Sequence, residues 1–574
     1  MIDLSKAQQL KEEIDKITKI TKRISFLRFC IFVCIVIFVV CFITLDQFIL
    51  YLSLSLLSIF CFIACVIFTS PLYHKLKLLT NLSFVYKKHE NRRNLSYHSF
   101  TPDGRELIDY KDYKELDLDL LGPRSLYQYL CVAKSKEGRS KLAKQLSFPE
   151  QKSEQFTACV ASLSKDEAVL RLEASISLIG ADAKDCDEKE MLGITKTKIK
   201  IPWYGFLLCA LSYGILAVFL TILLIHHIDP YFLFLFIPIN FLIAKRCIQS
   251  EVFVFPSTKY ANLLSAYKRL AKDVLEIELD DPYYKNLQKT IEAQYNSLVK
   301  LSRIFEMLSY RKNIILSIVG NGLFYLDYIL AGFFNSFTKH LDSIEECLDA
   351  LSELELLLSL ATIGIDQETY CIPQKTGGFT IVDGYHPLVK SCVANSFHFS
   401  GGIILTGSNM SGKTTFMRML GVNQILANAG GIVCAKEFCT GTYQVVTSLR
   451  ANDMLQEGIS TFYAEVHRMK QIMECSHSRD TLVLVDEIFK GTNAKDRIYA
   501  AKEIIHKLSK MGVYFLITTH DFELCDVEEI KNYHFDEEYV GDQITFDYKI
   551  KDGKCQKTNA IYLLKLAGVL DTKE

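Results

Sequence analysis

The chain has 574 residues and a formal net charge of -1, so it is long enough for several domains and carries no overall basic excess. This charge balance excludes a uniformly basic nucleic-acid-binding protein, although a local basic face is compatible with it. The 18 cysteines include no pair at zinc-binding spacing, and many lie in apolar stretches. They are typical of small apolar side chains in a reducing compartment and not of a disulfide framework.

Residues 1–24 carry apolar side chains at helical spacing among lysines and acids, which predicts an amphipathic helix that packs on a partner helix or lies on a membrane. Two uncharged runs follow, and Pro71 is expected to end the second. No small-residue cleavage site follows the first run, which disfavours a cleaved signal peptide. Basic residues flank both outer ends, so the positive-inside rule places these ends in the cytoplasm. We predict a transmembrane hairpin over residues 25–77, with spans at about 27–45 and 48–69.

A second transmembrane hairpin is predicted over residues 196–246, with spans at about 203–225 and 229–244. Its first run is uncharged and begins with an interfacial tryptophan, Trp203. Its second run is short and is interrupted by Pro238 and Asn240, so by length alone it could be re-entrant.

The other stretches before residue 366 are predicted to be helical. Residues 78–195 form the first part of a helical core, and residues 247–365 form the second part. The second part includes a long lever-like arm from Tyr260 to Met307, where apolar residues recur at helical spacing. Ile314 to Phe334 is also apolar, but it contains polar residues and three glycines.

A nucleotide-binding motif follows the apolar run Gly402 to Thr406, which predicts a short buried strand. The next residues fit the G-x-x-x-x-G-K-[ST] pattern of a phosphate loop at every defined position. Glycines let the backbone wrap the phosphates, Lys413 is expected to reach the β- and γ-phosphates, and Thr414 is expected to bind Mg²⁺. A helix is predicted from Thr415 to about Asn428. The predicted ATP-binding residues of this loop are Gly407, Ser408, Asn409, Met410, Ser411, Gly412, Lys413, Thr414 and Thr415.

Two further predicted strands end in polar residues. Thr481 to Asp486 is an apolar run that ends in an acid, and Glu487 follows it. Asp486 suits the Mg²⁺ shell, and Glu487 suits the general base that orients or deprotonates an attacking water. Val513 to Thr518 precedes His520, which lies where a sensor of the γ-phosphate is expected. Because the carboxyl ends of parallel strands meet at one edge of a sheet, these residues predict an α/β ATPase domain.

The position of this domain constrains the membrane topology. ATP is a cytosolic nucleotide, so the number of crossings before the phosphate loop has to be even. We therefore predict four spans, with both termini and the ATPase domain in the cytoplasm. A fifth span at Ile314 to Phe334 would export the ATPase domain, so this stretch is predicted to be a buried soluble helix.

A family resemblance becomes specific at Gly458 to Glu465, which has the form G-x-S-T-F-x-x-E. Between the phosphate loop and the L-V-D-E-I-x-x-G-T run, this segment resembles the ATPase domain of the MutS mismatch-repair family, an ABC-type ATPase. Asp383 to Pro387 resembles the G-R-H-P segment of the family, which implies that His386 also binds the nucleotide. Thr518 to Leu524 resembles its T-H-x-x-E-L segment, and Asp117 to Pro149 resembles the start of its helical core.

The resemblance implies a head-to-tail homodimer that closes on ATP and relaxes after hydrolysis. Ser460 would then cap the γ-phosphate held by the phosphate loop of the partner chain. The implied catalytic residues are Lys413, Glu487, His520 and Ser460, and the implied Mg²⁺ ligands are Thr414 and Asp486. The implied ATPase domain covers residues 366–574.

The chain also departs from the family pattern. The first hairpin occupies the residues before Asp117, where a mismatch-recognition domain would lie, and the second hairpin interrupts the helical core. Tyr385 replaces an arginine of the G-R-H-P segment. Asn493 and Arg497 replace a serine and a glycine of the family, which affects the expected coupling across the dimer.

We therefore expect a multi-domain protein with a helical core and lever, transmembrane hairpins and a C-terminal α/β phosphate-loop domain. It would be a multi-pass protein of a bacterial inner membrane that contacts lipid and couples ATP hydrolysis to movement of its helical arms. The alternative is a membrane-tethered DNA-binding protein of mismatch repair or recombination type that recognises distorted duplex DNA. An ABC-type transporter fits poorly, because short hairpins offer little polar intramembrane surface.

Overall fold

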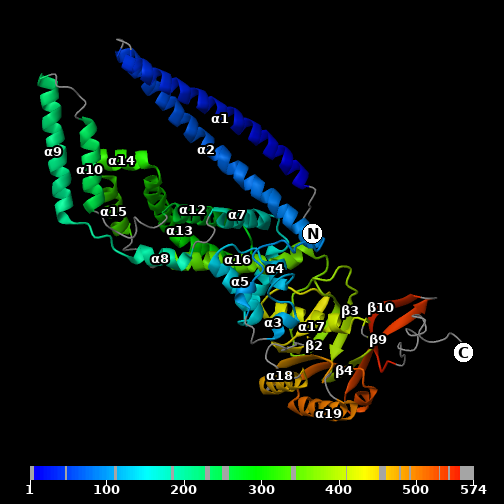
Figure 1. The fold of residues 1–574 in the computed structure, drawn as a ribbon. Helices are drawn as coiled ribbons and strands as arrows, with labels where there is room; N and C mark the ends of the chain where they lie inside the picture. Colours follow the sequence, from blue (N-terminus) through cyan, green and yellow to red (C-terminus); the bar gives the residue numbers. More distant parts are fainter. Residues whose placement is uncertain are drawn as a thin grey trace.

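The computed structural model consists of a helical region up to Asp366 and a C-terminal α/β domain (Figure 1). The structure describes residues 6–44, 48–108, 113–182, 187–226, 233–247, 257–337, 344–408, 410–450, 461–476, 480–489, 493–528, 530–540 and 543–555. The helices of the first region are α1 (Lys6–Thr44), α2 (Phe48–Arg93), α3 (Tyr113–Asp117), α4 (Leu126–Leu130), α5 (Lys136–Ser147), α6 (Glu154–Leu163), α7 (Ala168–Asp182), α8 (Glu188–Lys196), α9 (Trp203–His226), α10 (Leu233–Cys247), α12 (Ser257–Glu276), α13 (Pro282–Leu308), α14 (Ile314–Phe324), α15 (Leu326–Phe337) and α16 (Ile344–Asp366).

The first hairpin is longer than the sequence predicts. α1 is one continuous helix of 39 residues, so the predicted amphipathic helix 1–24 and the first span are not separate elements. α2 runs through Pro71 and ends only at Arg93, so the prediction that Pro71 ends this helix was wrong. A proline inside a helix costs one backbone hydrogen bond, about 3 kcal/mol. Packing of α1 against α2 offsets that loss.

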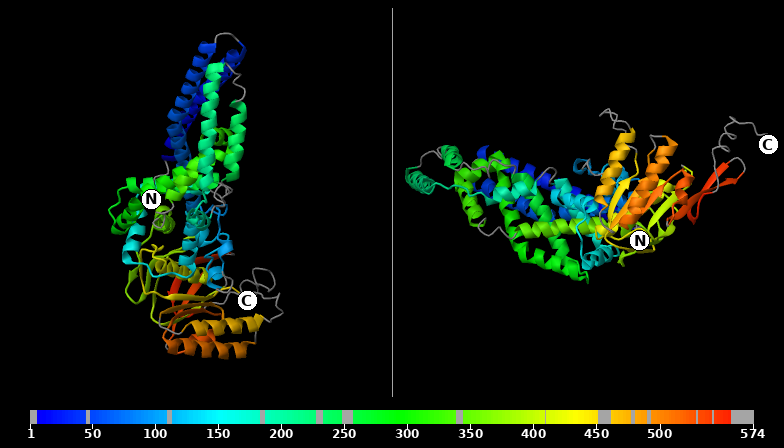
Figure 2. Two further views of the ribbon diagram at one scale, coloured as in Figure 1. Left: turned by 90° about the vertical axis from the view of Figure 1, so that its left-hand side faces the viewer. Right: turned by 90° about the horizontal axis from the view of Figure 1, so that it is seen from below.

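Two helices among the described residues, α1 and α2, are long and apolar enough to cross a membrane by length and composition. In α9, Trp203–Val218 is a shorter apolar helix, and α10 has 15 residues and contains Pro238. The predicted count of four spans therefore stays a prediction. Both hairpins extend away from the α/β domain in the same direction (Figure 2).

The stretch that was predicted to be one buried soluble helix forms two helices, α14 and α15. They are bent by 84° relative to each other, with Tyr325 at the corner. Large apolar side chains on both helices are exposed, among them Ile314 at 73% and Phe333 at 62%. The prediction of one helix was therefore wrong, and the stretch is buried only on part of its surface, with Asn321 at 1% and Phe334 at 0% exposure.

In its described residues, the α/β domain contains two sheets and three long helices. Its strands are β1 (Gln374–Lys375), β2 (Phe379–Gly384), β3 (Asn395–Phe399), β4 (Gly402–Thr406), β5 (Glu437–Thr440), β6 (Gln444–Ser448), β7 (Thr481–Asp486), β8 (Tyr514–Thr518), β9 (Lys531–Val540) and β10 (Gln543–Asp552). The helices are α17 (Lys413–Asn428), α18 (Thr461–Cys475) and α19 (Ala494–Met511). The smaller sheet has the order β1-β5-β2-β3, and the larger has the order β10-β9-β4-β8-β7-β6.

The larger sheet positions the predicted site. From β9 to β6 its neighbouring strands are parallel, and β10 alone runs antiparallel to its neighbour. The central strands β4, β7 and β8 are almost entirely buried, as expected for parallel strands that are covered on both faces. Since β8 lies between β4 and β7, the residues that follow these three strands meet at one edge.

A buried contact joins the helical region to the α/β domain at Asp117, the last residue of α3. Its carboxylate accepts hydrogen bonds from Thr447 Oγ1 at 2.8 Å and from the N–H of Leu449 at 3.0 Å. Arg468 of α18 also pairs with it. Asp117 therefore holds both sides of residues 451–460, which lie outside the described residues.

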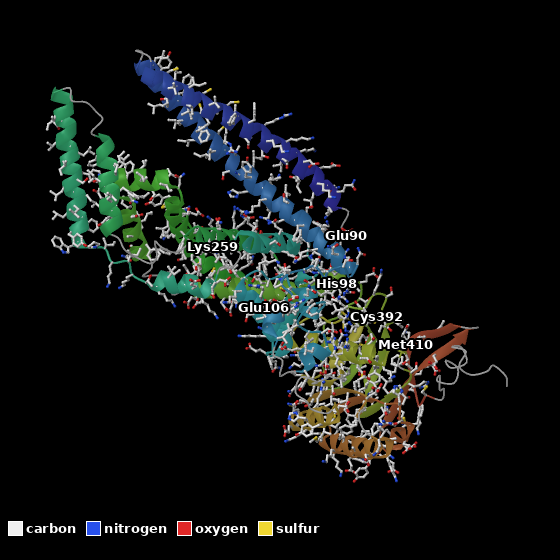
Figure 3. The ribbon with its side chains drawn as sticks, in the orientation of Figure 1. Glu90, His98, Glu106, Lys259, Cys392 and Met410 are labelled. Carbon is white, nitrogen blue, oxygen red and sulfur yellow. The ribbon has the colours of Figure 1, made fainter. Side chains whose placement is uncertain are left out.

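A second buried contact joins α2 to the end of α16. His89 of α2 has Nδ1 2.9 Å from Asp366 Oδ1 and Nε2 2.8 Å from Glu173 Oε2. Burial disfavours the charged imidazole, but the two carboxylates outweigh burial and raise the pKa of His89. Asp366 is the last residue of α16, so this ion cluster fixes the end of α2 beside the start of the α/β domain. Glu90, the next residue along α2, is labelled at this end of the helix in Figure 3.

Replacing His89 by glutamine is expected to lower stability most at acidic pH. The pKa of His89 is raised in the folded state, so protonation of His89 stabilises the folded wild type. This contribution to the free energy of unfolding is fully present below about pH 6.5, the ordinary histidine pKa. This gain is lost as the pH rises through the raised pKa. Thermal unfolding of both proteins in one detergent, from about pH 6 to 9, measures the difference. A difference that is constant with pH would contradict a charged His89.

Candidate nucleotide site

The loop between β4 and α17 requires glycine at two positions. Gly407 has φ 141° and Gly412 has φ 101°, both in the region that favours glycine. A Cβ at Gly407 would lie 2.9 Å from the carbonyl oxygen of Phe535, and one at Gly412 would lie 3.1 Å from the ring of Tyr548. These constraints explain why the pattern carries glycine at these two places.

The lysine of the pattern lies inside this loop. Lys413 is only 4% exposed, and its ammonium group donates hydrogen bonds to the carbonyl oxygens of Gly407 at 2.7 Å and Ser408 at 2.8 Å. The hydroxyl of Ser411 also donates to the Ser408 carbonyl, at 2.8 Å. Since α17 begins at Lys413, positive charge and the helix N-terminus face the same loop, which suits an anionic ligand.

A series of hydrogen bonds joins the ends of the three strands. Thr414 Oγ1 donates to Asp486 Oδ2 at 2.7 Å, and Thr518 Oγ1 donates to Asp486 Oδ1 at 2.5 Å. The N–H of Glu487 donates to Thr518 Oγ1 at 2.9 Å, and His520 Nε2 lies 3.1 Å from Glu487 Oε1. The structure thus brings together four predicted site residues, Thr414, Asp486, Glu487 and His520.

The oxygen atoms at this edge fit a magnesium ion. A threonine hydroxyl and a carboxylate are hard oxygen ligands, and those of Thr414 and Asp486 lie side by side. Within the described parts of the chain, no group of three or more His, Cys, Asp or Glu side chains is placed to hold a metal. This donor set suits Mg²⁺, which binds one or two protein oxygens together with phosphates and water.

A pocket of about 450 Å³ opens beside the phosphate loop. Its lining includes Cys392, Met410, Phe535 and Tyr548 together with Lys413. Cys392 and Met410 lie close together in Figure 3. The ring of Tyr548 is 44% exposed. This pocket offers apolar and aromatic surface next to the phosphate loop.

His386 contacts Cys392, one of the residues that line this pocket. Its N–H donates to Cys392 Sγ at 3.4 Å, and its Nδ1 accepts from the N–H of Leu388 at 3.2 Å. Burial and the nearby Arg418 lower the pKa of His386 to about 4, so its imidazole is neutral at pH 7. These contacts position the turn that lines the pocket, and nucleotide binding by His386 itself stays a prediction.

Of four further predicted site residues, two line the pocket and two lie outside the described residues. Met410 and Thr415 line the pocket. Asn409 and Ser460 lie outside the described residues, so their roles stay predictions.

Three residues at or near the site were not predicted. Thr518 ends the predicted strand two residues before His520, and this place could have suggested it. Tyr548 gave no local signal, because it reaches the pocket from a distant part of the chain. Asp117 contacts Thr447 at the end of β6, and the sequence singled it out only as the start of the segment that resembles the helical core.

The fold and the loop geometry define the class of this domain: a parallel α/β sheet with a glycine-rich loop between its central strand and a helix. Residues 403–572 match the family model of MutS domain V. The C-terminal α/β domain of this chain is therefore similar to MutS domain V over these residues.

Curated relatives agree with this assignment. The chain is 33% identical over 251 residues to a protein named DNA mismatch repair protein MutS from Methanosarcina mazei, over 40% of this chain and 28% of the relative. It is 31% identical over 255 residues to the protein of that name from Acetivibrio thermocellus (41% and 29%). It is 33% identical over 269 residues to that from Bacillus licheniformis (44% and 31%). The chain thus matches less than a third of the length of each relative.

Proposed function

We propose that the chain is a membrane-anchored MutS-like ATPase that hydrolyses ATP at the ends of β4, β7 and β8. The observation that carries this proposal is the series of hydrogen bonds from Thr414 through Asp486 and Thr518 to Glu487 and His520. The match to MutS domain V supports it.

Each residue has a defined role in this proposal. Lys413 and the loop N–H groups bind the phosphates, and Thr414 and Asp486 hold Mg²⁺. When bound, Mg²⁺ neutralises phosphate charge and acts as a Lewis acid. Glu487 accepts the proton of the attacking water, and His520 holds the Glu487 carboxylate in place and senses the γ-phosphate.

The pocket beside the loop suits the base of the nucleotide. Tyr548 contacts the loop through Gly412, and Asn395 fixes the Tyr548 backbone through a 2.9 Å hydrogen bond to its carbonyl oxygen. Because the exposed ring of Tyr548 lies next to the phosphate loop, it can stack on the purine base of ATP.

Replacing Tyr548 by alanine is expected to raise the KM for ATP about tenfold, because a stacked aromatic ring contributes roughly 1–3 kcal/mol per base. The rate at saturating ATP is expected to change little, since Tyr548 takes no part in the series of hydrogen bonds from Thr414 to His520. A phenylalanine variant keeps the ring and is the matched control. If the alanine variant had an unchanged KM for ATP, the proposal that the base binds in this pocket would be contradicted.

The domain is proposed to act in a head-to-tail homodimer. Ser460 of one chain would cap the γ-phosphate that Lys413 of the other chain holds. Asp117 contacts β6 on one side of residues 451–460 and α18 on the other, so it links this segment to the helical region. We further propose that closure of the dimer moves the helical arms formed by α12 and α13.

Mixing two inactive variants tests this arrangement. Lys413→Ala and Ser460→Ala chains are each expected to lose ATP hydrolysis. In a mixed dimer, one site combines the intact Lys413 with the intact Ser460, so an equal mixture is expected to recover about a quarter of the wild-type rate. No recovery after subunit exchange would contradict a site shared between two chains.

The membrane anchors are proposed to be the two hairpins. The helices of both hairpins extend to the same side, opposite the α/β domain, so one bilayer can hold both (Figure 2). Basic residues precede and follow each hairpin in the sequence, which favours a cytoplasmic α/β domain.

The alternative function is DNA binding, which similarity to proteins named DNA mismatch repair protein MutS favours. The helical region also carries an opposing feature, a cavity of about 1130 Å³ whose lining has six acidic side chains and two lysines. Duplex binding by the full-length protein across a salt series separates the two functions, because phosphate contacts weaken steeply with salt. Absence of binding at low salt would remove the alternative.

A further inference from the structure

The bent pair α14 and α15 is part of the same apolar body as the second hairpin. Asn240 of α10 donates from Nδ2 to the carbonyl oxygen of Gly322 at 3.0 Å and accepts from the Tyr325 hydroxyl at 2.7 Å. Tyr213 of α9 donates to the carbonyl oxygen of Leu323 at 2.5 Å. The corner between α14 and α15 is therefore fixed to the middle of both hairpin helices.

Close backbone packing supports this arrangement. A Cβ at Gly322 would lie 2.7 Å from the carbonyl oxygen of Ile237, so α14 and α10 approach more closely than larger residues allow. A Cβ at Gly205 of α9 would lie 2.1 Å from the Tyr328 hydroxyl of α15. Small residues at such contacts are typical of helices packed within membranes.

The outer faces of the pair are apolar and exposed. Leu316 is 53% exposed and Phe324 is 60% exposed on α14, and Phe333 is 62% exposed on α15. The neighbouring α9 is exposed in the same manner, with Leu211 at 54% and Ile215 at 67%. Many exposed large apolar side chains on packed helices are typical of a surface that meets another apolar phase.

The charged residues around α14 and α15 indicate that this apolar phase is a lipid bilayer. Arg311 and Lys312 precede α14, and Lys339 follows α15. The only charged residue from Asn313 to Thr338 is Asp327. It is 1% exposed, and it accepts from the Tyr310 hydroxyl at 2.6 Å. Basic residues at both ends of an uncharged surface suit anionic headgroups on the cytoplasmic side of a bilayer.

We propose that α14 and α15 form a re-entrant membrane element, which enters the cytoplasmic leaflet beside the second hairpin and leaves on the same side. The proposal rests on the proposed membrane anchoring. The two helices have 11 and 12 residues. At 1.5 Å per residue each is about 16–18 Å long, roughly half of a hydrocarbon core. An element that returns to its own side adds no crossing, so the α/β domain stays cytoplasmic.

Quenching of tryptophan fluorescence by brominated lipids tests contact with lipid, because the chain contains one tryptophan, Trp203. Full-length protein is placed in phosphatidylcholine and phosphatidylglycerol vesicles with bromine on the acyl chains. In a Trp203→Phe background, Phe324→Trp and Phe333→Trp are expected to be quenched at least as strongly as Trp203 in the wild type. Phe148→Trp, at a 56% exposed position after α5, is the control and is expected to show no quenching.

The outcomes separate this inference from the proposed anchoring. Lack of quenching at Phe324→Trp or Phe333→Trp, with Trp203 quenched, would overturn the inference and leave the hairpin in the membrane. Lack of quenching at Trp203 as well would overturn the anchoring of the second hairpin and the inference together.

Labelling from either side of the membrane tests the return path. Biotin-acceptor peptides are inserted after Asp280, between α12 and α13, and after Lys339. Both are expected to bind avidin from the side that carries the α/β domain. Avidin binding from opposite sides would show a full crossing and overturn the re-entrant path.

Discussion

Replacing Glu487 by glutamine is expected to lower ATP hydrolysis by about 10²–10⁴-fold, the usual contribution of a general base. ATP binding is expected to stay close to that of the wild type, because Lys413 and Thr414 are unchanged. Glutamine also keeps an oxygen that can meet His520 Nε2, which lies 3.1 Å from Glu487 Oε1. Phosphate release and nucleotide binding by the purified full-length chain measure the two effects separately.

The matched control is Glu503→Gln on α19, where the side chain is exposed and away from the strand ends. Hydrolysis by this variant is expected to equal that of the wild type. If Glu487→Gln hydrolysed ATP at the wild-type rate, the assignment of Glu487 as the general base would be contradicted.

Replacing Asp117 by asparagine is expected to destabilise the protein by about 3–5 kcal/mol, because it leaves the buried guanidinium of Arg468 without its charge partner. Hydrolysis is also expected to fall, since Asp117 holds both sides of the segment that carries Ser460. Thermal unfolding and ATP hydrolysis below the unfolding temperature report the two losses.

Asp119→Asn provides the comparison for Asp117. Asp119 pairs with Arg418 at 2.8 Å and with Arg450, but its side chain is 32% exposed. Pairs that water reaches contribute at most about 1 kcal/mol, so this variant is expected to be only slightly destabilised. Equal losses in the two variants would contradict the special role of the buried contact.

The strand ends of the site could be predicted from the sequence because each is a local pattern. A buried apolar run followed by Gly407, by Asp486 or by Thr519-His520 needs no knowledge of the remote chain. Parallel pairing then brings the ends together, as the hydrogen bonds of Thr414 and Glu487 confirm. The order of the strands and the antiparallel β10 depend on pairing across long distances and could not be predicted.

The errors in the helical region have physical causes. Pro71 was expected to end a helix, but packing between helices of one hairpin overrides local propensity. Ile314 to Phe334 was assigned by counting crossings, and that count does not distinguish a soluble helix from an element that returns to the same side. Tyr548 reaches the pocket, and Asp117 reaches the end of β6, only through tertiary contacts.

α2 is a single helix of 46 residues that ends beside the His89 cluster. At 1.5 Å per residue it measures about 69 Å, more than twice the hydrocarbon thickness of a bilayer. One stiff rod thus reaches from the hairpin turn to the start of the nucleotide-binding domain. Energetic coupling between two sites is reciprocal. If ATP moves this rod within the lipid, then the thickness and tension of the bilayer must alter the affinity for ATP to the same degree.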